Sequence, residues 1–103
     1  TVNISGVTYL SVWGQIISDL TGIEDFTALT SLYSDYNQLT SLDVSNNTAL
    51  TYLSCLDNQL TSLDLSNNTA LTSLYCDGNQ LNSLDLSNHT ALRYLKCSNK
   101  NLH

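Results

Sequence analysis

A repeat of 21 residues constrains this chain more than any other feature of its sequence. The segments LTSLYSDYNQLTSLDVSNNTA (29–49), LTYLSCLDNQLTSLDLSNNTA (50–70) and LTSLYCDGNQLNSLDLSNHTA (71–91) align without gaps. Residues 92–103 form the front half of a further unit, and a divergent unit precedes the array at 7–28. Because self-similarity at a fixed period is the signature of repeat architectures, the sequence predicts a solenoid.

Each unit carries the pattern LxxLxLxxN twice, first as LTYLSCLDN (50–58) and then as LTSLDLSNN (60–68). In LxL the leucines point to one side and the residue between them to the other, as in a short strand. Coils stacked about 4.8 Å apart would pair these strands in parallel, and about five coils would make a rod roughly 24 Å long. We expect a β-rich solenoid with two narrow parallel sheets back to back and little or no helix.

Asparagines recur where each half-coil bends. Asn37, Asn58 and Asn79 occupy the first-half bend, and Asn47 and Asn68 occupy the second. A buried Asn can bond the backbone of a neighbouring turn and tolerates left-handed conformations. These columns end at Lys100 and His89, so we expect weaker specification toward the C-terminus. The predicted inward leucines are Leu10, Leu32, Leu53, Leu74 and Leu95 in one column and Leu20, Leu42, Leu63 and Leu84 in the other.

Residues 29–103 strongly resemble the bacterial leucine-rich repeat class with the consensus LxxLxCxxNxLxxLDLxxNxx, the nested 21-residue type. Residues 17–28, ISDLTGIEDFTA, also resemble the internalin-type units that often precede such arrays. We expect one solenoid domain that is a fragment of a longer protein. In it, 1–28 form a divergent first coil and N-terminal edge, and 29–103 hold three complete repeats and a partial one. The resemblance implies a secreted or surface-exposed bacterial protein used in interaction or adhesion.

The charge of the chain is acidic and unevenly distributed. A formal net charge of −6 argues against nucleic acid or an anionic membrane surface as a partner. Arg93, Lys96 and Lys100 are the only basic residues, whereas every Asp and Glu lies at or before Asp85. With Leu102 exposed on an uncapped last coil, this polarity predicts a homodimer or an end-to-end contact through the C-terminal coil. No apolar stretch is long enough to predict a membrane span.

The sequence offers little catalytic chemistry. His89 and His103 are the only histidines, one at a turn and one terminal, so no nucleophile, base and orienter can be assembled. We therefore predict that the segment is not an enzyme and has no cofactor.

The cysteines share one inward column. Cys55, Cys76 and Cys97 are 21 residues apart and align with Val12 and Ser34, so we interpret them as small hydrophobic side chains in a buried thiol ladder. Neighbouring coils could bring two Cα atoms within disulfide range, but parallel side chains and an odd count argue against pairing. No CxxC or histidine partner occurs at metal-ligand spacing, so zinc binding is a weaker alternative.

The outward positions of the first-half strands carry most of the aromatic residues. Five of the six tyrosines and the only tryptophan fall there, and the second-half strands have none. Tyr and Trp give large, stiff contact area with a polar group and are enriched at hot spots and sugar-stacking platforms. Alternatively, aromatics suit strands and only cover neighbouring backbone. We favour a binding face, whose candidate residues are Tyr9, Trp13, Tyr33, Tyr52, Leu56, Tyr75, Tyr94 and Lys96.

The outward positions of the second half are acidic and hydroxylated. Asp43, Asp64 and Asp85 form a column with serines on both sides. Calcium is an alternative ligand because oxygen atoms are abundant, but carboxylates in single file give poor six- to eight-fold coordination. We interpret this face as a solvated surface without a metal, which keeps the solenoid soluble.

We therefore predict a protein–protein interaction module of an extracellular or cell-surface bacterial protein, which binds a host or bacterial surface protein through its Tyr/Trp face. The alternative is a carbohydrate-binding or architectural segment of a larger surface enzyme or adhesin, in which the same face would bind a glycan.

Overall fold

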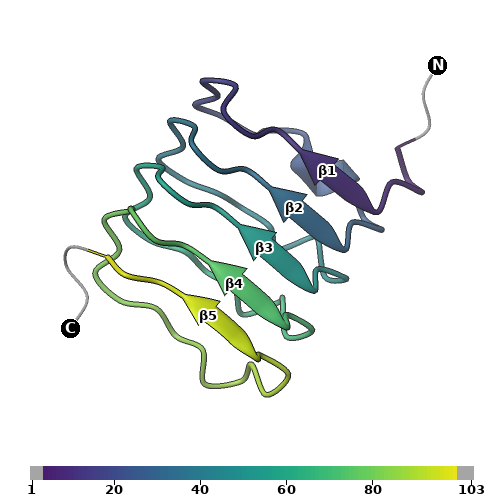
Figure 1. The fold of residues 1–103 in the computed structure, drawn as a ribbon. Helices are drawn as coiled ribbons and strands as arrows, with labels where there is room; N and C mark the ends of the chain where they lie inside the picture. The colour runs from purple at the N-terminus through teal and green to yellow at the C-terminus, as the bar shows by residue number, and fades with distance from the viewer. Residues whose placement is uncertain (1–3, 100–103) are drawn as a thin grey trace.

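The computed structural model describes residues 4–99 as a solenoid whose strands form one parallel sheet in chain order (Figure 1). One short 3-10 helix, η1 (Ile23–Asp25), lies in the first coil. The predicted solenoid with short parallel strands and little helix is confirmed. The strands are β1 (Tyr9–Ser11), β2 (Ser31–Tyr33), β3 (Tyr52–Ser54), β4 (Ser73–Tyr75) and β5 (Tyr94–Lys96).

The register of the sheet follows the repeat. Leu10 pairs with Leu32, and the same position continues through Leu53, Leu74 and Leu95. Because alternate strand residues point to opposite faces, this register directs one leucine of every strand into the interior and leaves its two neighbours on the outer face. The first predicted leucine column is confirmed as buried at Leu32, Leu53 and Leu74, whereas Leu10 is partly buried and Leu95 is exposed.

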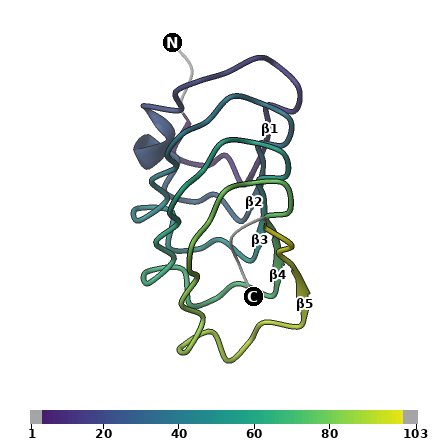
Figure 2. The ribbon, with the colours of Figure 1, turned by 90° about the vertical axis from the view of Figure 1, so that its left-hand side faces the viewer.

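The core lies between the sheet and the second-half segments that run behind it (Figure 2). Leu32, Leu53 and Leu74 are fully buried from the sheet side, and Leu42 and Leu63 are buried from the opposite side. At the two ends Leu20 and Leu84 are only partly buried, since each lacks a neighbouring coil on one side. Burial of apolar surface between the two halves of each coil is the main stabilising term of such a stack.

The prediction of a second parallel sheet is wrong. All five strands belong to the first halves of the coils, and no strand is present in the second halves within residues 4–99. In the second halves the backbone N–H groups donate instead to the aspartate two residues earlier, with N···Oδ1 distances of 2.9–3.0 Å. The donors are Ser45, Ser66 and Ser87. A side chain that accepts these protons turns the backbone locally and competes with a strand ladder.

The first-half asparagines form a ladder that uses both ends of each amide. Asn58 Nδ2 donates to the carbonyls of Ser34, Cys55 and Leu56, and its Oδ1 accepts from the Leu39 N–H. Asn37 and Asn79 make the equivalent bonds in their own coils. The ladder therefore joins consecutive bends through buried hydrogen bonds.

The second-half ladder uses only one end of each side chain. Asn68 Nδ2 donates to the carbonyls of Val44 and Asn47, and Asn47 donates to those of Ile23 and Phe26. The Oδ1 atoms of Asn47 and Asn68 are buried and have no hydrogen-bond partner among the described residues. His89 continues this ladder with its Nε2 atom 2.8 Å from the Leu65 carbonyl.

The last coil differs from the prediction. The first-half ladder continues through Asn99, whose Oδ1 accepts from Leu81 N–H and whose Nδ2 donates to Cys76 O, one residue before the predicted end of the column. Lys100 and Leu102 lie outside the described residues. All three residues of β5 are exposed, because no further coil covers this strand within 4–99.

Candidate functional site

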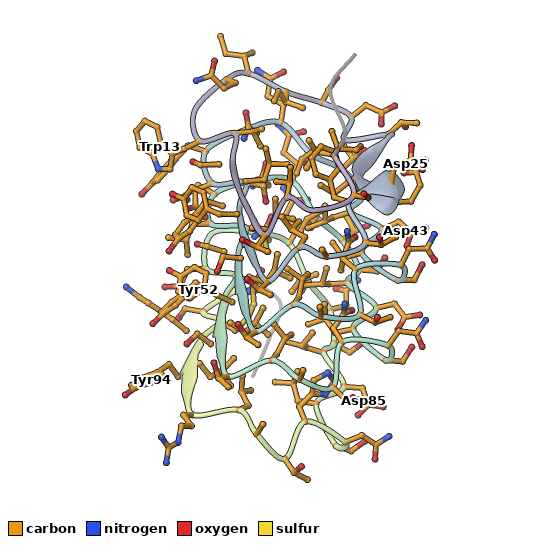
Figure 3. The ribbon with its side chains drawn as sticks, turned by 90° about the vertical axis from the view of Figure 1, so that its right-hand side faces the viewer. Trp13, Asp25, Asp43, Tyr52, Asp85 and Tyr94 are labelled. Atoms are coloured by element: carbon orange, nitrogen blue, oxygen red, sulfur yellow. A yellow bond between two sulfur atoms is a disulfide. The ribbon has the colours of Figure 1, made fainter. Side chains whose placement is uncertain are left out.

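The outer face of the sheet carries the predicted binding residues. Trp13, Tyr52 and Tyr94 lie on this side of the solenoid, and Asp43 and Asp85 lie on the opposite side (Figure 3). The two surface characters predicted for the two halves are therefore separated in space.

Four tyrosines of this face form an unbroken run of ring contacts, which we call the tyrosine ridge (Tyr9, Tyr33, Tyr52 and Tyr75). Successive ring centroids are 5.3, 4.7 and 5.5 Å apart, and the rings are tilted by 34–49°. These separations and tilts fall in the range of favourable aromatic pairs.

The ridge is a zigzag across the strands. Tyr9 and Tyr52 occupy the first position of their strands, while Tyr33 and Tyr75 occupy the third. Each of the first three tyrosines consequently pairs with a serine of the next strand, as Tyr33 does with Ser54, whereas Tyr75 pairs with Lys96. A serine beside each of the first three rings leaves room for the next ring to lie diagonally across it.

The ridge both covers the sheet and exposes aromatic surface. Ser54 and Ser73 are buried next to the ring-bearing positions of neighbouring strands, so the tyrosines do cover their neighbours. Tyr9 is nevertheless 60% exposed, and Tyr33 and Tyr75 are half-buried. The two interpretations of the aromatic face are therefore compatible.

The C-terminal end of the face is different in character. Tyr94 is 61% exposed and makes no ring contact with another described aromatic residue. Lys96, at the third position of β5, instead places its Nζ atom 3.6 Å from Asp77 Oδ2. The aromatic run therefore gives way to a cationic side chain on the last strand.

A second aromatic pair lies in the bends that follow the strands, and only one of its two residues, Trp13, was predicted from the sequence. The Trp13 and Tyr36 rings meet edge to face at 5.3 Å, and both are exposed, as is Ile16 nearby in the chain. Tyr36 was not predicted because it lies in the bend after the strand, at φ 57°. The signal that could have found it is its place in the repeat, where Gly14, Asp57 and Gly78 also have positive φ.

Strand alternation continued past Tyr33 would place Asp35 on the outer face, but Asp35 is buried and only 5% exposed. Its Oδ1 accepts hydrogen bonds from the Ser54 hydroxyl at 2.5 Å and from the Leu56 N–H at 2.8 Å. The alternation fails here because the strand ends at Tyr33 and the chain bends. Leu56, at the same position of the next coil, is half-buried.

The hydroxyl of Tyr52 is the most perturbed group of the ridge. Burial raises the pKa of Tyr52 to about 12, and the neighbouring Tyr33, Tyr75 and Asp35 act in the same direction. The phenol therefore stays protonated and neutral at physiological pH.

Solved structures with this fold come from Listeria monocytogenes strain 4b F2365. The crystal structure of internalin C2 matches with a TM-score of 0.90 and 28% identity, covering 94% of this chain and 44% of that one. The crystal structure of internalin F matches with a TM-score of 0.88 and 31% identity, covering 95% of this chain and 29% of that one. The chain has the leucine-rich repeat fold of the internalins.

Sequence comparison agrees with the internalin fold. Internalin J of Listeria monocytogenes serotype 4b (strain F2365) is 46% identical over 44 residues, which are 43% of this chain and 5% of internalin J. The chain thus spans less than half the length of each of these internalins. No family model matches it. The predicted resemblance to bacterial leucine-rich repeat proteins with an internalin-like unit is confirmed.

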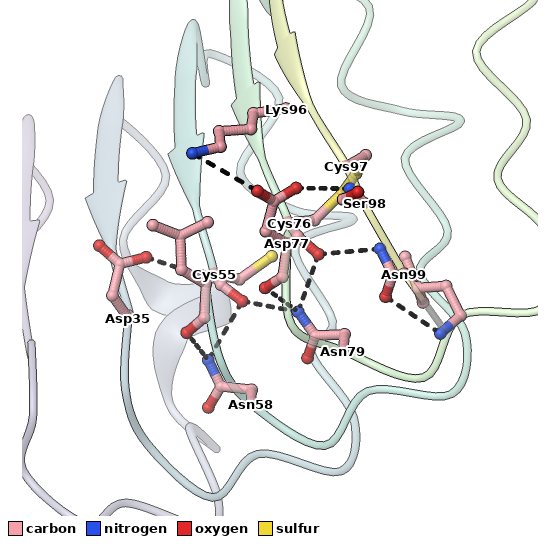
Figure 4. The surroundings of a disulfide bond; sticks show 12 residues. Asp35, Cys55, Asn58, Cys76, Asp77, Asn79, Lys96, Cys97, Ser98 and Asn99 are labelled. Atoms are coloured by element: carbon pink, nitrogen blue, oxygen red, sulfur yellow. Dashed lines mark hydrogen bonds and ion pairs between the residues drawn. A yellow bond between two sulfur atoms is a disulfide. The ribbon is translucent and has the colours of Figure 1, made fainter. Parts of the chain in front are cut away.

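The cysteine column of this internalin-type solenoid is not a row of three thiols. Cys76 and Cys97 form a disulfide across adjacent coils, with Cα atoms 4.6 Å apart, and Cys55 is free and buried (Figure 4). The coil spacing places the Cα atoms of neighbouring cysteines within disulfide range. Burial raises the pKa of the Cys55 thiol to about 12, so it is a poor nucleophile.

The acidic face consists of local turns. Hydrogen bonds from the Ser45 hydroxyl and N–H lower the pKa of Asp43, and the N–H and hydroxyl of Ser66 lower that of Asp64. Within residues 4–99, no three His, Cys, Asp or Glu side chains are grouped so that they could hold a metal ion. A shallow hollow near Asp19, Glu24 and Asp43 is lined mainly by polar atoms.

None of the helical structure in the described part of the chain is long and apolar enough to cross a membrane.

Proposed function

We propose that this chain is a protein-interaction module of a secreted or surface-exposed bacterial protein, and that the outer face of its sheet binds the partner. The observation that carries the proposal is the tyrosine ridge, four rings in contact along a parallel sheet. Stiff aromatic side chains on a rigid scaffold lose little conformational entropy on binding. The binding residues we assign are Tyr9, Trp13, Tyr33, Tyr52, Leu56, Tyr75, Tyr94 and Lys96, together with Ile16 and Tyr36.

We assign no catalytic role to the segment. The His89 side chain is buried in the second-half ladder, where its Nε2 contacts a backbone carbonyl. The raised pKa of Cys55 and its complete burial keep the free thiol from acting on a substrate. The internalin fold supports an interaction role, and the surface location rests on that likeness.

A display selection tests the proposal. Peptide and protein-domain libraries are selected on the immobilised chain, and the selected binders are measured against the double variant Tyr33→Ala/Tyr75→Ala. We expect the variant to lose binding at least about tenfold, as for hot-spot residues. Ser62→Ala, on the acidic side, is the control and should bind as the parent does. Binders that tolerate the double variant would contradict the assignment.

Glycan arrays probe the alternative with the same proteins. Binding of a glycan to the parent chain, lost in Tyr33→Ala/Tyr75→Ala, would favour a carbohydrate-binding segment. The zigzag of tilted rings argues for protein partners, because a sugar stacks best on a flat, fully exposed ring face.

We also propose an end-to-end contact between copies through the last coil. Leu95 of β5 is 52% exposed. Arg93 and Lys96 lie in the last described coil, whereas Glu24 and Asp25 lie in the first. Exposed strand edges pair readily with another strand. Light scattering at high concentration should show dimers or larger species that dissociate with salt, and a strictly monomeric mass would contradict the contact.

A further inference from the structure

The tyrosine ridge is bordered by two carboxylates that share one local structure. Asp35 and Asp77 both follow a strand that has tyrosine at its third position, in the segments SLYSD (31–35) and SLYCD (73–77). Oδ1 of Asp35 accepts from Leu56 N–H, and Oδ1 of Asp77 accepts from Ser98 N–H, the equivalent residue one coil further on. The two sites are therefore copies of each other, two coils apart.

One copy contains a cation and the other does not. The position beside Asp77 is filled by Lys96, whose Nζ lies 3.6 Å from Asp77 Oδ2, on the strand residue that pairs with Tyr75 (Figure 4). The equivalent residue beside Asp35 is Ser54, which pairs with Tyr33. The hydrogen bonds to the Asp35 carboxylate, from the Ser54 hydroxyl and the Leu56 N–H, both reach its Oδ1. The chain thus shows in its own last coil what kind of group fits next to a Tyr–Asp pair.

The Asp35 copy adjoins the tightest ring contact of the ridge, since Asp35 bonds Ser54, the strand partner of Tyr33. Tyr33 and Tyr52 have ring centroids 4.7 Å apart, and the negative charge of Asp35 contributes to the raised pKa of Tyr52. Ring faces carry negative potential, and a nearby carboxylate adds to it, so a cation over the rings is attracted by both. An anion at this place would be repelled by the same groups.

We propose that the tyrosine ridge binds a cationic segment of its protein partner, with an Arg or Lys side chain lying over Tyr33 and Tyr52 in front of Asp35. This inference rests on the proposed function and specifies the chemistry of the partner. A net charge of −6 on this chain favours the same class of partner at long range. Arginine fits best, because its planar guanidinium stacks on aromatic rings.

Peptide titration of the whole chain tests the proposal. The probe is the peptide Ac-Gly-Arg-Gly-Arg-Gly-amide. Two control peptides have citrulline or glutamate in place of both arginines. Ring-proton signals of the tyrosines and backbone amide signals report the site of binding by NMR. We expect the arginine peptide to shift the Tyr33 and Tyr52 ring signals and to bind at least about threefold more tightly than the citrulline peptide, the size of an exposed cation–π contact.

Two pairs of variants separate the site from general attraction to an acidic protein. Asp35→Asn and Asp64→Asn each remove one negative charge, but only Asp35→Asn should weaken the shifts at Tyr33 and Tyr52. Lys96→Ser and Arg93→Ser each remove one positive charge from the last coil. Only Lys96→Ser should open the second copy, so that the arginine peptide also shifts the Tyr75 ring signals.

The outcomes distinguish the two proposals. Equal binding of the citrulline or glutamate peptide at the ridge overturns the cationic partner and leaves the interaction face standing. Equal responses of Lys96→Ser and Arg93→Ser, or peptide shifts confined to the acidic face, also overturn it. If no peptide or selected binder contacts the ridge, the proposed function fails with it. Lys96 is 66% exposed, so its replacement does not endanger folding.

Discussion

The two halves of each coil begin from almost the same leucine pattern and end as different structures. The first half forms a strand, pairs with its neighbours and carries the tyrosine ridge, while the second half forms turns around Asp43, Asp64 and Asp85. Both halves bury their leucines in one core. The difference therefore lies in the residue between the leucines: Ser or Tyr leaves the backbone free to pair, whereas Asp takes the N–H two residues later.

The asparagine ladders differ in the same way. The first-half ladder satisfies both the amide N–H₂ and the carbonyl oxygen, and the second-half ladder leaves buried oxygens of Asn47 and Asn68 without a described partner. Satisfied buried networks fix a structure more firmly than partly satisfied ones. We expect the sheet side to be the more rigid half of the solenoid.

Replacing one asparagine in each ladder should give the largest effects. Asn58→Leu removes four hydrogen bonds and should lower the free energy of unfolding by about 3 kcal/mol or more, because buried backbone groups lose their partners. Asn68→Leu removes two and also removes an unpartnered oxygen, so about 1 kcal/mol is expected. Urea unfolding monitored by circular dichroism measures both. Equal losses would abolish the proposed difference between the ladders.

Substitutions in the first-half bend should have the next largest effect. Gly78→Ala places a Cβ 3.2 Å from the Asp57 Cα at φ 75°, and we expect a loss of about 1–2 kcal/mol. Asp57→Gly at the equivalent bend relieves a positive φ and should cost much less or stabilise slightly. Thermal unfolding of both variants gives the comparison. A stabilised Gly78→Ala would show that the bend is not constrained.

The pH dependence of stability should separate the halves. The folded state holds the Tyr52 proton more tightly than the unfolded chain, so the free energy of unfolding should fall as pH rises from about 10 to about 12. Tyr52→Phe should reduce this alkaline loss. Asp43 and Asp64 have lowered pKa values in the folded state, so they stabilise it above the ordinary pKa of 3.8. This stabilisation is lost as pH falls through the lowered pKa values.

The matched variant at low pH is Asp64→Asn. It should reduce the loss of stability at acid pH, the acid limb of the curve of unfolding free energy against pH, and leave the alkaline limb unchanged. Urea midpoints across pH measure both limbs. If Tyr52→Phe changed the acid limb instead, the assignment of the limbs to the two halves would be wrong.

The smallest expected effect concerns the cysteines, which occur only in the first halves of the coils. It is measured by counting the free thiols. Alkylation in denaturant without reductant should modify Cys55 alone, and all three cysteines should react after reduction, because Cys76 and Cys97 are paired. Peptide mass spectrometry identifies the modified residues. Three reactive thiols before reduction would restore the ladder of free cysteines that the sequence predicts.

The sequence predicted the parts of this molecule that depend on a strict period. The solenoid, the first-half strands and the Leu32, Leu53 and Leu74 positions follow from a 21-residue repeat and from strand alternation. The second sheet was predicted wrongly because LDL has the same alternation as LSC. Whether the backbone pairs or turns was decided by a local Asp hydrogen bond that hydrophobic periodicity does not detect.

The candidate face was predicted as a set of residues and not as an arrangement. The alternation of YLS and SLY strands is visible in the sequence, but the register of the sheet is needed to show that it joins the rings diagonally. Strand alternation alone does not place Asp35, because the strand ends at Tyr33. The end of the asparagine column was predicted one residue late, because the last bend is one residue shorter. Both differences occur at bends.

The zigzag of the ridge also limits how such a chain can change its length. Tyr33 and Tyr75 are 42 residues apart, so the surface pattern repeats every second coil although the core repeats every coil. Duplication or deletion of a single coil would preserve the leucine core yet place tyrosine against tyrosine in the register. A change of two coils would preserve both. The gene segment that can be copied without damaging the surface is therefore twice as long as the one that preserves the fold.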